Sequence, residues 1–192
     1  MPQGKEDAYV ALVEIVPPAF DVMHDIAYAT SDNITGHPIY KRPACYLHEE
    51  AAICLKQAII YAAELGLMLK IFDAYRPSEA QFILWEHTPD PAFLANPHKG
   101  SPHSRGVAVD LSLVTRDGVA LDMGTPFDDF SQSSYHGASY ISDDAKRNRL
   151  LLLGIMTSAG FDFYRNEWWH YQLFNSKSYP VLSDAAAGTA MM

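Results

Sequence analysis

Two short stretches of the chain combine residue types that could bind a metal ion and support hydrolysis. Residues 101–110 (SPHSRGVAVD) place a histidine in a turn just before a carboxylate, and residues 166–170 (NEWWH) place a glutamate three residues before a histidine. Two imidazole nitrogens and one carboxylate oxygen form a zinc site that leaves a fourth position open for water. We therefore expect one zinc ion held by His103, Asp110 and His170.

Glu167 lies at the entrance of the second stretch and is predicted to be a base rather than a ligand. Zinc lowers the pKa of a bound water to about 7, and a carboxylate beside that water can accept its proton. Asp110 lies between Val109 and Leu111 on a predicted strand, where a buried charge needs compensation. Gly106 would let the backbone turn tightly and bring His103 beside Asp110.

A third stretch, residues 72–77 (FDAYRP), places Arg76 between a predicted buried strand and a predicted helix. A guanidinium in that position could stabilise the oxyanion of a tetrahedral intermediate, or it could bind a carboxylate through two hydrogen bonds. Arg76 is therefore a candidate for transition-state stabilisation.

Simpler interpretations of the same residues remain open from spacing alone. His103 could be an ordinary hydrogen-bonded turn residue, and Asp110 could cap a turn or pair with Arg105. Tryptophans such as those at 168–169 are most often core residues. Arg76 could form a surface salt bridge, which contributes little to stability. Periodicity does not show that the three stretches meet in space.

The elements that must position these residues alternate without a regular strand-helix-strand order. This mixture predicts a single α+β domain over residues 1–192, with a central, mainly antiparallel sheet flanked by helices. Residues 1–7 and 183–192 carry no pattern that could bury a face, so we expect loose tails there. The expected strands are 8–16, 67–72, 107–114 and 168–174, and the expected helices are 48–65, 77–87 and 142–159.

Composition excludes several other classes of function. The chain has 192 residues, 48% of them hydrophobic, which is enough for one sizeable core. Its net charge is −9 and its lysines and arginines are not clustered, which argues against nucleic acid and anionic membranes as partners. Cys45 and Cys54 form no CxxC pair, so we expect free thiols and no thiolate zinc site.

Nothing in the sequence suggests a targeting or membrane segment. The N-terminus lacks the apolar stretch of a signal peptide, and no segment approaches the roughly 18 apolar residues of a membrane span. We therefore expect a cytoplasmic protein, or a periplasmic one if a leader had been removed. The sequence does not predict an oligomeric state.

The two metal-binding stretches together match the pattern S-x-H-x-x-G-x-A-x-D followed by E-x-W-H. The chain thereby resembles a group of zinc peptidases that includes D,D-carboxypeptidases, some phage endolysins and the Hedgehog signalling domain. Within that group it resembles the D-alanyl-D-alanine dipeptidases associated with vancomycin resistance (the VanX type). The closer resemblance covers roughly residues 8–180 and includes the segments 28–36, 73–77, 123–128 and 160–171.

The resemblance implies an activity and a role for each site residue. The activity would be zinc-dependent hydrolysis of D-Ala-D-Ala to two D-alanines, in a Hedgehog/D,D-peptidase-like fold. Glu167 would be the base and later the proton donor, Arg76 would stabilise the transition state, and Asp128 would pair with the substrate ammonium. Ser101 and Tyr28 would lie near the substrate. Pro102 departs from the small polar residue expected beside the first ligand and should stiffen the loop.

Two alternatives follow from the same scaffold. One is a D,D-carboxypeptidase or cell-wall endopeptidase, and the other is a non-enzymatic zinc-binding domain. The intact Glu167 and Arg76 argue against the second, because a structural zinc site would not need them. For a dipeptidase, an unpaired buried carboxylate could reject peptides that lack a free ammonium in the right place, and Asp128 is the candidate.

Overall fold

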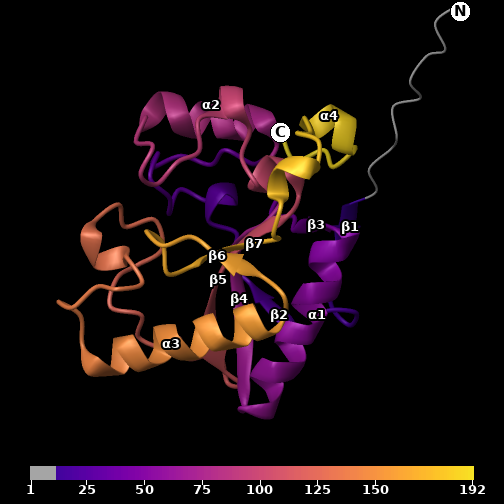
Figure 1. Ribbon diagram of the computed structural model, residues 1–192. Helices are drawn as coiled ribbons and strands as arrows, with labels where there is room; N and C mark the ends of the chain where they lie inside the picture. Colours follow the sequence, from indigo (N-terminus) through magenta and orange to yellow (C-terminus); the bar gives the residue numbers. More distant parts are fainter. Residues whose placement is uncertain (1–11) are drawn as a thin grey trace, which may run out of the picture.

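A five-stranded sheet forms the centre of the computed structural model, which describes residues 12–192 (Figure 1). The strand order is β2-β4-β5-β7-β6. β2 (Val22–His24) runs parallel to β4 (Leu67–Asp73), and every other neighbouring pair is antiparallel: β4 with β5 (Ala108–Thr115), β5 with β7 (His170–Gln172), and β7 with β6 (Asp162–Phe163). This mixed, mainly antiparallel sheet confirms the predicted α+β class.

A separate two-stranded sheet pairs β1 (Leu12–Glu14) with β3 (Tyr46–His48). β1 lies within the strand expected over residues 8–16, of which residues 8–11 lie outside the described part of the chain. The tail expected over residues 1–7 lies outside it as well. The three-residue strands β2 and β3 were not predicted, because strands that short carry no readable alternation.

Two long helices, α1 (Glu49–Glu64) and α3 (Asp143–Ser158), contact each other, and they cover the central strands β4 and β5 respectively. Ser142 caps the start of α3, since its hydroxyl accepts a hydrogen bond from the Ala145 amide at 3.0 Å. The shorter helices α2 (Ser78–His87) and α4 (Asp184–Ala187) lie together toward the opposite end of the molecule (Figure 1).

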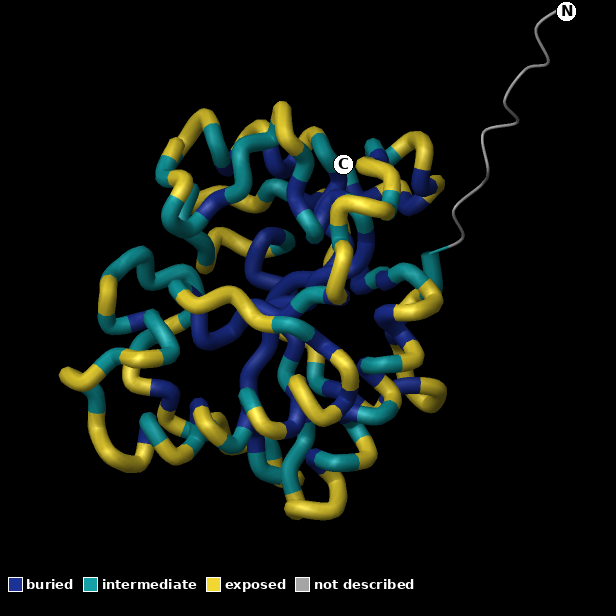
Figure 2. Tube along the Cα trace, viewed as in Figure 1, coloured by how far each residue is buried: buried dark blue, intermediate teal, exposed yellow. Residues whose placement is uncertain are grey.

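Strand β5 runs through the middle of the protein and is covered on both faces. All of its residues except Thr115 are buried, and the buried tube in Figure 2 passes through the centre of the molecule. The residues of the strand alternate between apolar side chains and smaller or polar ones, and the structure buries both sets. Asp110 on this strand is only 2% exposed, so its charge must be balanced by neighbouring groups.

The C-terminal segment 183–192 is not the loose tail that its sequence suggested. It forms α4, and the Met191 side chain is 0% exposed. The Asp184 carboxylate accepts hydrogen bonds from the backbone amides of Met191 and Met192, and Arg42 donates to the carbonyl of Ala190. The prediction was wrong because hydrogen bonds between side chains and backbone groups, together with the buried residues Ala187, Thr189 and Met191, hold this segment without producing an amphipathic pattern.

The cysteines and the helices agree with the sequence in two further respects. Cys45 and Cys54 are free thiols, as predicted. Within residues 12–192, none of the helices combines the length and the apolar character that crossing a bilayer would require.

Candidate metal centre and active site

The three predicted ligands are brought together by one turn and two paired strands. His103 opens a short 3-10 turn that ends at Gly106, whose φ of 69° is left-handed. A side chain at Gly106 would meet Leu12 at 2.7 Å, so glycine suits both the conformation and the space. β5 then carries Asp110 directly opposite His170 of β7. The predicted return of the chain at Gly106 is confirmed.

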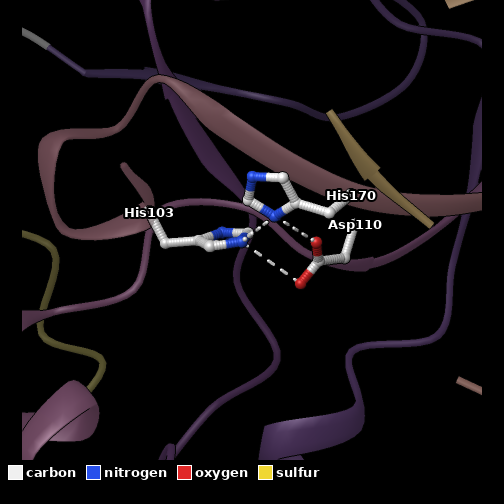
Figure 3. A group of neighbouring side chains, drawn as sticks. All are labelled: His103, Asp110 and His170. Carbon is white, nitrogen blue, oxygen red and sulfur yellow. Dashed lines mark hydrogen bonds and ion pairs between the residues drawn. The ribbon is translucent and has the colours of Figure 1, made fainter. Parts of the chain in front are cut away.

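The donor atoms of the three residues face one another in a buried cluster (Figure 3). His103 Nε2 lies 3.1 Å from His170 Nδ1 and 3.3 Å from an Asp110 oxygen, and His170 Nδ1 lies 3.1 Å from the other Asp110 oxygen. Nitrogens held about 2.0–2.1 Å from a tetrahedral zinc ion are about 3.3 Å apart. The spacing and the donor types therefore fit one zinc ion without rearrangement.

Neighbouring acceptors fix which ring nitrogen each histidine offers. His103 Nδ1 lies 2.8 Å from the Ala74 carbonyl, and His170 Nε2 lies 3.0 Å from the Gln172 side-chain oxygen. Because these oxygens can only accept, the ring nitrogens facing them carry the hydrogen. The lone pairs of His103 Nε2 and His170 Nδ1 are then directed into the cluster, as metal ligands require.

Charge neighbours set the protonation of the Asp110 carboxylate. Burial alone would raise its pKa, but His103 and His170, when their rings are protonated, attract the carboxylate and donate hydrogen bonds to it, and so hold its pKa well below its usual range. Asp110 is therefore an anion, which is the form that binds a cation. Its Oδ2 also lies 3.5 Å from Arg76 Nη2, whereas Arg105 donates to the carbonyl of Lys99. The alternative pairing of Asp110 with Arg105 is excluded.

Glu167 lies beside the cluster without belonging to it. Its Oε2 is 3.8 Å from His170 Nδ1, and the residue is 5% exposed. Burial, followed by repulsion from Asp110 and Asp128, raises the pKa of Glu167 well above its usual value. A carboxylate with a raised pKa holds a proton more readily, which is the property that general acid–base catalysis at neutral pH requires.

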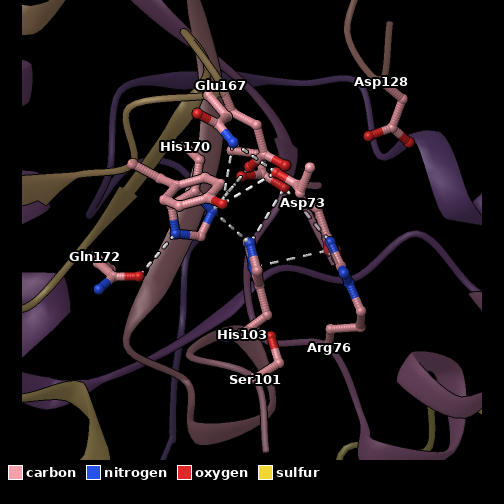
Figure 4. Close-up of polar contacts among 12 residues, drawn as sticks. Asp73, Arg76, Ser101, His103, Asp128, Glu167, His170 and Gln172 are labelled. Atoms are coloured by element: carbon pink, nitrogen blue, oxygen red, sulfur yellow. Dashed lines mark hydrogen bonds and ion pairs between the residues drawn. The ribbon is translucent and has the colours of Figure 1, made fainter. Parts of the chain in front are cut away.

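Arg76 is buried in the same region, which excludes the surface salt bridge considered from the sequence. Its Nε donates to Asp73 Oδ2 at 2.8 Å and its Nη1 donates to the Gln81 side chain at 2.9 Å. The guanidinium lies 4.9 Å from the centre of the Tyr28 ring. Figure 4 shows Arg76 beside Asp73 and His103. Contacts on several sides fix the guanidinium rigidly.

Sequence reasoning missed the residues that hold these side chains in place. Asp73 receives hydrogen bonds from both Arg76 and Tyr40, and a register shift after Ile71 sets Asp73 opposite Asp110. Gln172, at the end of β7, orients His170. The available signal was a carboxylate at the end of a buried strand, three residues before an arginine. That spacing indicates an ion pair between Asp73 and Arg76, but it does not indicate which other residues contact the pair.

The predicted substrate residues border the cluster from other loops. The Tyr28 hydroxyl donates to Asp128 Oδ2 at 2.8 Å, and Asp128 adopts an uncommon left-handed φ of 60°. Burial raises the pKa of Asp128 to about 7, although Tyr28 and Arg76 oppose the shift. Figure 4 shows Asp128 on a loop apart from the ligands. Ser101 is buried, and its hydroxyl accepts from the His103 amide at 3.2 Å.

One cavity of ≈ 360 Å³ is lined by every site residue that the sequence predicted. This volume is at the small end of the range for small-molecule sites. Apolar side chains, including Phe93, Leu94 and Trp169, form part of the wall. The predicted site residues that line the cavity are Tyr28, Arg76, Ser101, His103, Asp110, Asp128, Glu167 and His170.

A buried His-Asp-His cluster with a neighbouring carboxylate, set in a mixed sheet flanked by helices, is the arrangement of a metallopeptidase. The sequence profile of the peptidase M15 family, described as D-Ala-D-Ala dipeptidase, matches residues 5–185. The chain belongs to this family and is therefore an enzyme of the dipeptidase type.

Curated relatives support the assignment over most of the chain. The D-alanyl-D-alanine dipeptidase of Escherichia coli K12 is 44% identical over 164 residues, which cover 85% of this chain and 85% of the relative. The dipeptidase of Enterococcus faecalis is 37% identical over 83% of this chain and 89% of the relative. The dipeptidase of Enterococcus faecium is 36% identical over 91% of this chain and 95% of the relative. The predicted resemblance is confirmed, and the family implies a metal cofactor.

Proposed function

We propose that this protein hydrolyses D-Ala-D-Ala to two D-alanines with one zinc ion held by His103, Asp110 and His170. The observation that carries the proposal is the convergence of the three donor atoms and Glu167 on one small cavity. The family and the names of the relatives support the substrate. The donor set supports zinc, because two imidazoles and a carboxylate with an open position are typical of catalytic zinc sites.

The chemistry follows from where Glu167 lies. When bound, zinc supplies a Lewis acid that makes an adjacent water nucleophilic near neutral pH. The Glu167 carboxylate accepts a proton from that water while the water oxygen forms a bond to the peptide carbonyl carbon. Glu167 then donates the proton to the leaving nitrogen as the C–N bond breaks, and the second proton of the water also ends on that nitrogen, which leaves one carboxylate and one ammonium group.

Arg76 stabilises the charge that develops on the carbonyl oxygen. Its guanidinium is fixed by Asp73 and Gln81 and lines the cavity, so it need not reorganise during the reaction. Preorganised donors of this kind typically contribute about 10²–10³ in kcat each. The same guanidinium lies 3.5 Å from Asp110 Oδ2 and therefore also helps to balance the ligand's charge.

The ends of the substrate are recognised by the remaining groups of the cavity. Asp128 pairs with the substrate ammonium, and Tyr28 holds Asp128 in place through its hydroxyl. Ser101 lines the wall beside the first ligand. A longer peptide carries an amide where the dipeptide carries an ammonium, so it would leave the Asp128 charge unpaired.

A zinc titration tests the proposal directly. We expect the metal-stripped protein to leave D-Ala-D-Ala intact and to recover turnover as zinc is added, saturating at one ion per chain. His103→Ala should lose both zinc and turnover, whereas substitution of the surface residue His87 should change neither. Full turnover in the stripped protein, or saturation at two ions, would overturn the zinc assignment.

A further inference from the structure

A buried arginine on α3 has no part in the chemistry proposed above. Arg149 is 2% exposed, and its hydrogen bonds go to uncharged oxygens in the described chain. Desolvation lowers the pKa of Arg149 to about 10, so the group stays charged at neutral pH. A buried charge is costly unless it is compensated, so these contacts require an explanation.

The contacts of Arg149 hold both ends of the segment 123–135, which carries Asp128. Arg149 Nε donates to the carbonyl of Met123 at 2.6 Å. Its Nη1 donates to the carbonyls of Ser133 and Tyr135 at 2.9 and 3.0 Å. One guanidinium therefore joins the start of this segment to its end.

The same segment is attached to the strand region that holds the catalytic residues. Thr125 Oγ1 accepts a hydrogen bond from the indole nitrogen of Trp168 at 2.8 Å, and the Ser134 carbonyl accepts one from the Trp168 amide at 3.0 Å. Trp168 directly follows Glu167 in the chain. Arg149, the loop and the region of Glu167 therefore form one hydrogen-bonded block.

We propose that Arg149 is a positioning residue that fixes Asp128 relative to the metal centre and thereby determines recognition of the substrate ammonium. The inference rests on the function proposed above. Asp128 lies between the two ends that Arg149 holds, and its φ of 60° is a conformation that the surrounding structure must maintain. Without the hydrogen bonds from Arg149, fewer contacts would keep Asp128 in that conformation.

The geometry explains why an arginine occupies this position. A guanidinium offers five donors in a planar fork, so it can reach three carbonyls that lie in different directions. A lysine would keep the charge but present one compact ammonium group. Arg149→Lys should therefore loosen the loop and raise KM for the dipeptide about tenfold, with kcat changed by less than about threefold, because the lost interaction binds ground state and transition state equally.

The test compares the wild type, Arg149→Lys, Asp128→Asn and the double variant. The probes are D-Ala-D-Ala and propanoyl-D-alanine, an analogue of the same length that lacks the ammonium. We expect Arg149→Lys to weaken binding of the dipeptide but leave Ki for the analogue unchanged. In the Asp128→Asn background the same change should add less than about twofold to KM, because the two residues act as one unit. Arg147→Lys, exposed on the same helix, is the matched control.

Two results would overturn the proposal. One is an equal loss of affinity for the dipeptide and the analogue, and the other is full additivity with Asp128→Asn. If Arg149→Lys does not fold, Thr125→Val removes another link of the block and is judged by the same comparisons. A wild type that leaves D-Ala-D-Ala intact would refute the proposed function itself. Intact wild-type turnover with additive variants refutes only the role of Arg149.

Discussion

At the scale of single residues, the proposed function assigns metal binding and proton transfer to different side chains. His103, Asp110 and His170 have donor atoms within 4.8 Å of one another, whereas Glu167 stands beside them with a raised pKa. Neutralising Glu167 should therefore affect chemistry and leave the metal in place.

We expect Glu167→Gln to lower kcat by about 10²–10⁴-fold, the usual contribution of general acid–base catalysis. Zinc content, measured by elemental analysis after dialysis, should stay at one ion per chain. Glu64→Gln, at the exposed end of α1, is the control and should match the wild type. Loss of zinc in Glu167→Gln would instead identify Glu167 as a ligand.

Asp128 should combine a functional gain with a cost in stability. Its pKa is raised to about 7, so the folded protein binds a proton there more tightly than the unfolded chain. Protonation of Asp128 therefore contributes most to the free energy of unfolding at a pH below the pKa of Asp128 in the unfolded chain. This contribution is lost as the pH rises through about 7.

Asp128→Asn should accordingly raise the Tm of the metal-free protein at pH 8 while raising KM for D-Ala-D-Ala about tenfold or more, because a charged hydrogen-bonded partner is lost. The measurements are thermal melts at pH 5 and pH 8 and steady-state kinetics. Asp129→Asn, the neighbouring residue, is the control. A lower Tm at pH 8 together with an unchanged KM would contradict the assigned role.

At the scale of elements, the segment between α2 and the first ligand closes one side of the cavity. Phe93 lines the cavity and stacks on Phe130 with ring centres 4.7 Å apart, and Tyr164 and Asn166 both donate to the carbonyl of Ala92. Phe130 follows Asp128 by two residues, so this aromatic pair joins the segment to the loop that would face the amino end of a substrate.

We therefore expect Phe93→Ala to relax the rejection of longer substrates. The ratio of kcat/KM for D-Ala-D-Ala to that for an N-acylated tripeptide should fall about tenfold, in line with the contribution of one hydrophobic contact to discrimination. Phe82→Ala, on the partly exposed face of α2, should keep the wild-type ratio. An unchanged ratio in Phe93→Ala would show that the wall does not limit peptide length.

The elements that could be predicted from the sequence were the longer ones with a periodic arrangement of apolar residues. The helices over 48–65 and 142–159 and the strands over 67–72 and 107–114 match α1, α3, β4 and β5 closely, since each carries several apolar residues. β2 and β6 have three and two residues, and they exist because they add to a sheet already formed by β4 and β7. Pairing of that kind is a tertiary property.

The site, too, could be predicted only in part from the sequence. All eight candidate residues line one cavity, because the motif spacing encodes a turn, a strand and a facing strand. Asp73, Gln81 and Gln172 could not be assigned beforehand, since their roles depend on a register shift and on contacts between distant segments. Motifs identify the reacting groups, and the fold decides which other side chains orient them.

At the scale of the whole molecule, the C-terminal segment completes the structure around the site. Leu182, directly before this segment, bonds through its backbone to Ser104, in the turn that carries His103, and to Ser78 of α2. The Lys41 amide donates to the carbonyl of Met191, close in sequence to Tyr40, which holds Asp73. The end of the chain therefore supports both sides of the cavity.

We expect Asp184→Ala to destabilise the protein by about 1–3 kcal/mol, because it leaves several hydrogen-bond donors of the C-terminal segment without their acceptor. Urea denaturation of the metal-free protein measures the change. Asp162→Ala, on the edge strand β6, is a control expected to shift stability less. A change below about 0.5 kcal/mol for Asp184→Ala, the range of ordinary surface substitutions, would show that the segment is not anchored there.

We propose that the cavity accepts a free dipeptide. The most direct test of this proposal is release of D-alanine by the zinc-loaded protein from D-Ala-D-Ala and, in parallel, from a cell-wall pentapeptide that ends in the same two residues. We predict rapid cleavage of the dipeptide and little release from the pentapeptide, because Asp128 would be left without its ammonium. Preferential cleavage of the pentapeptide would contradict the account and assign the site to a D,D-carboxypeptidase.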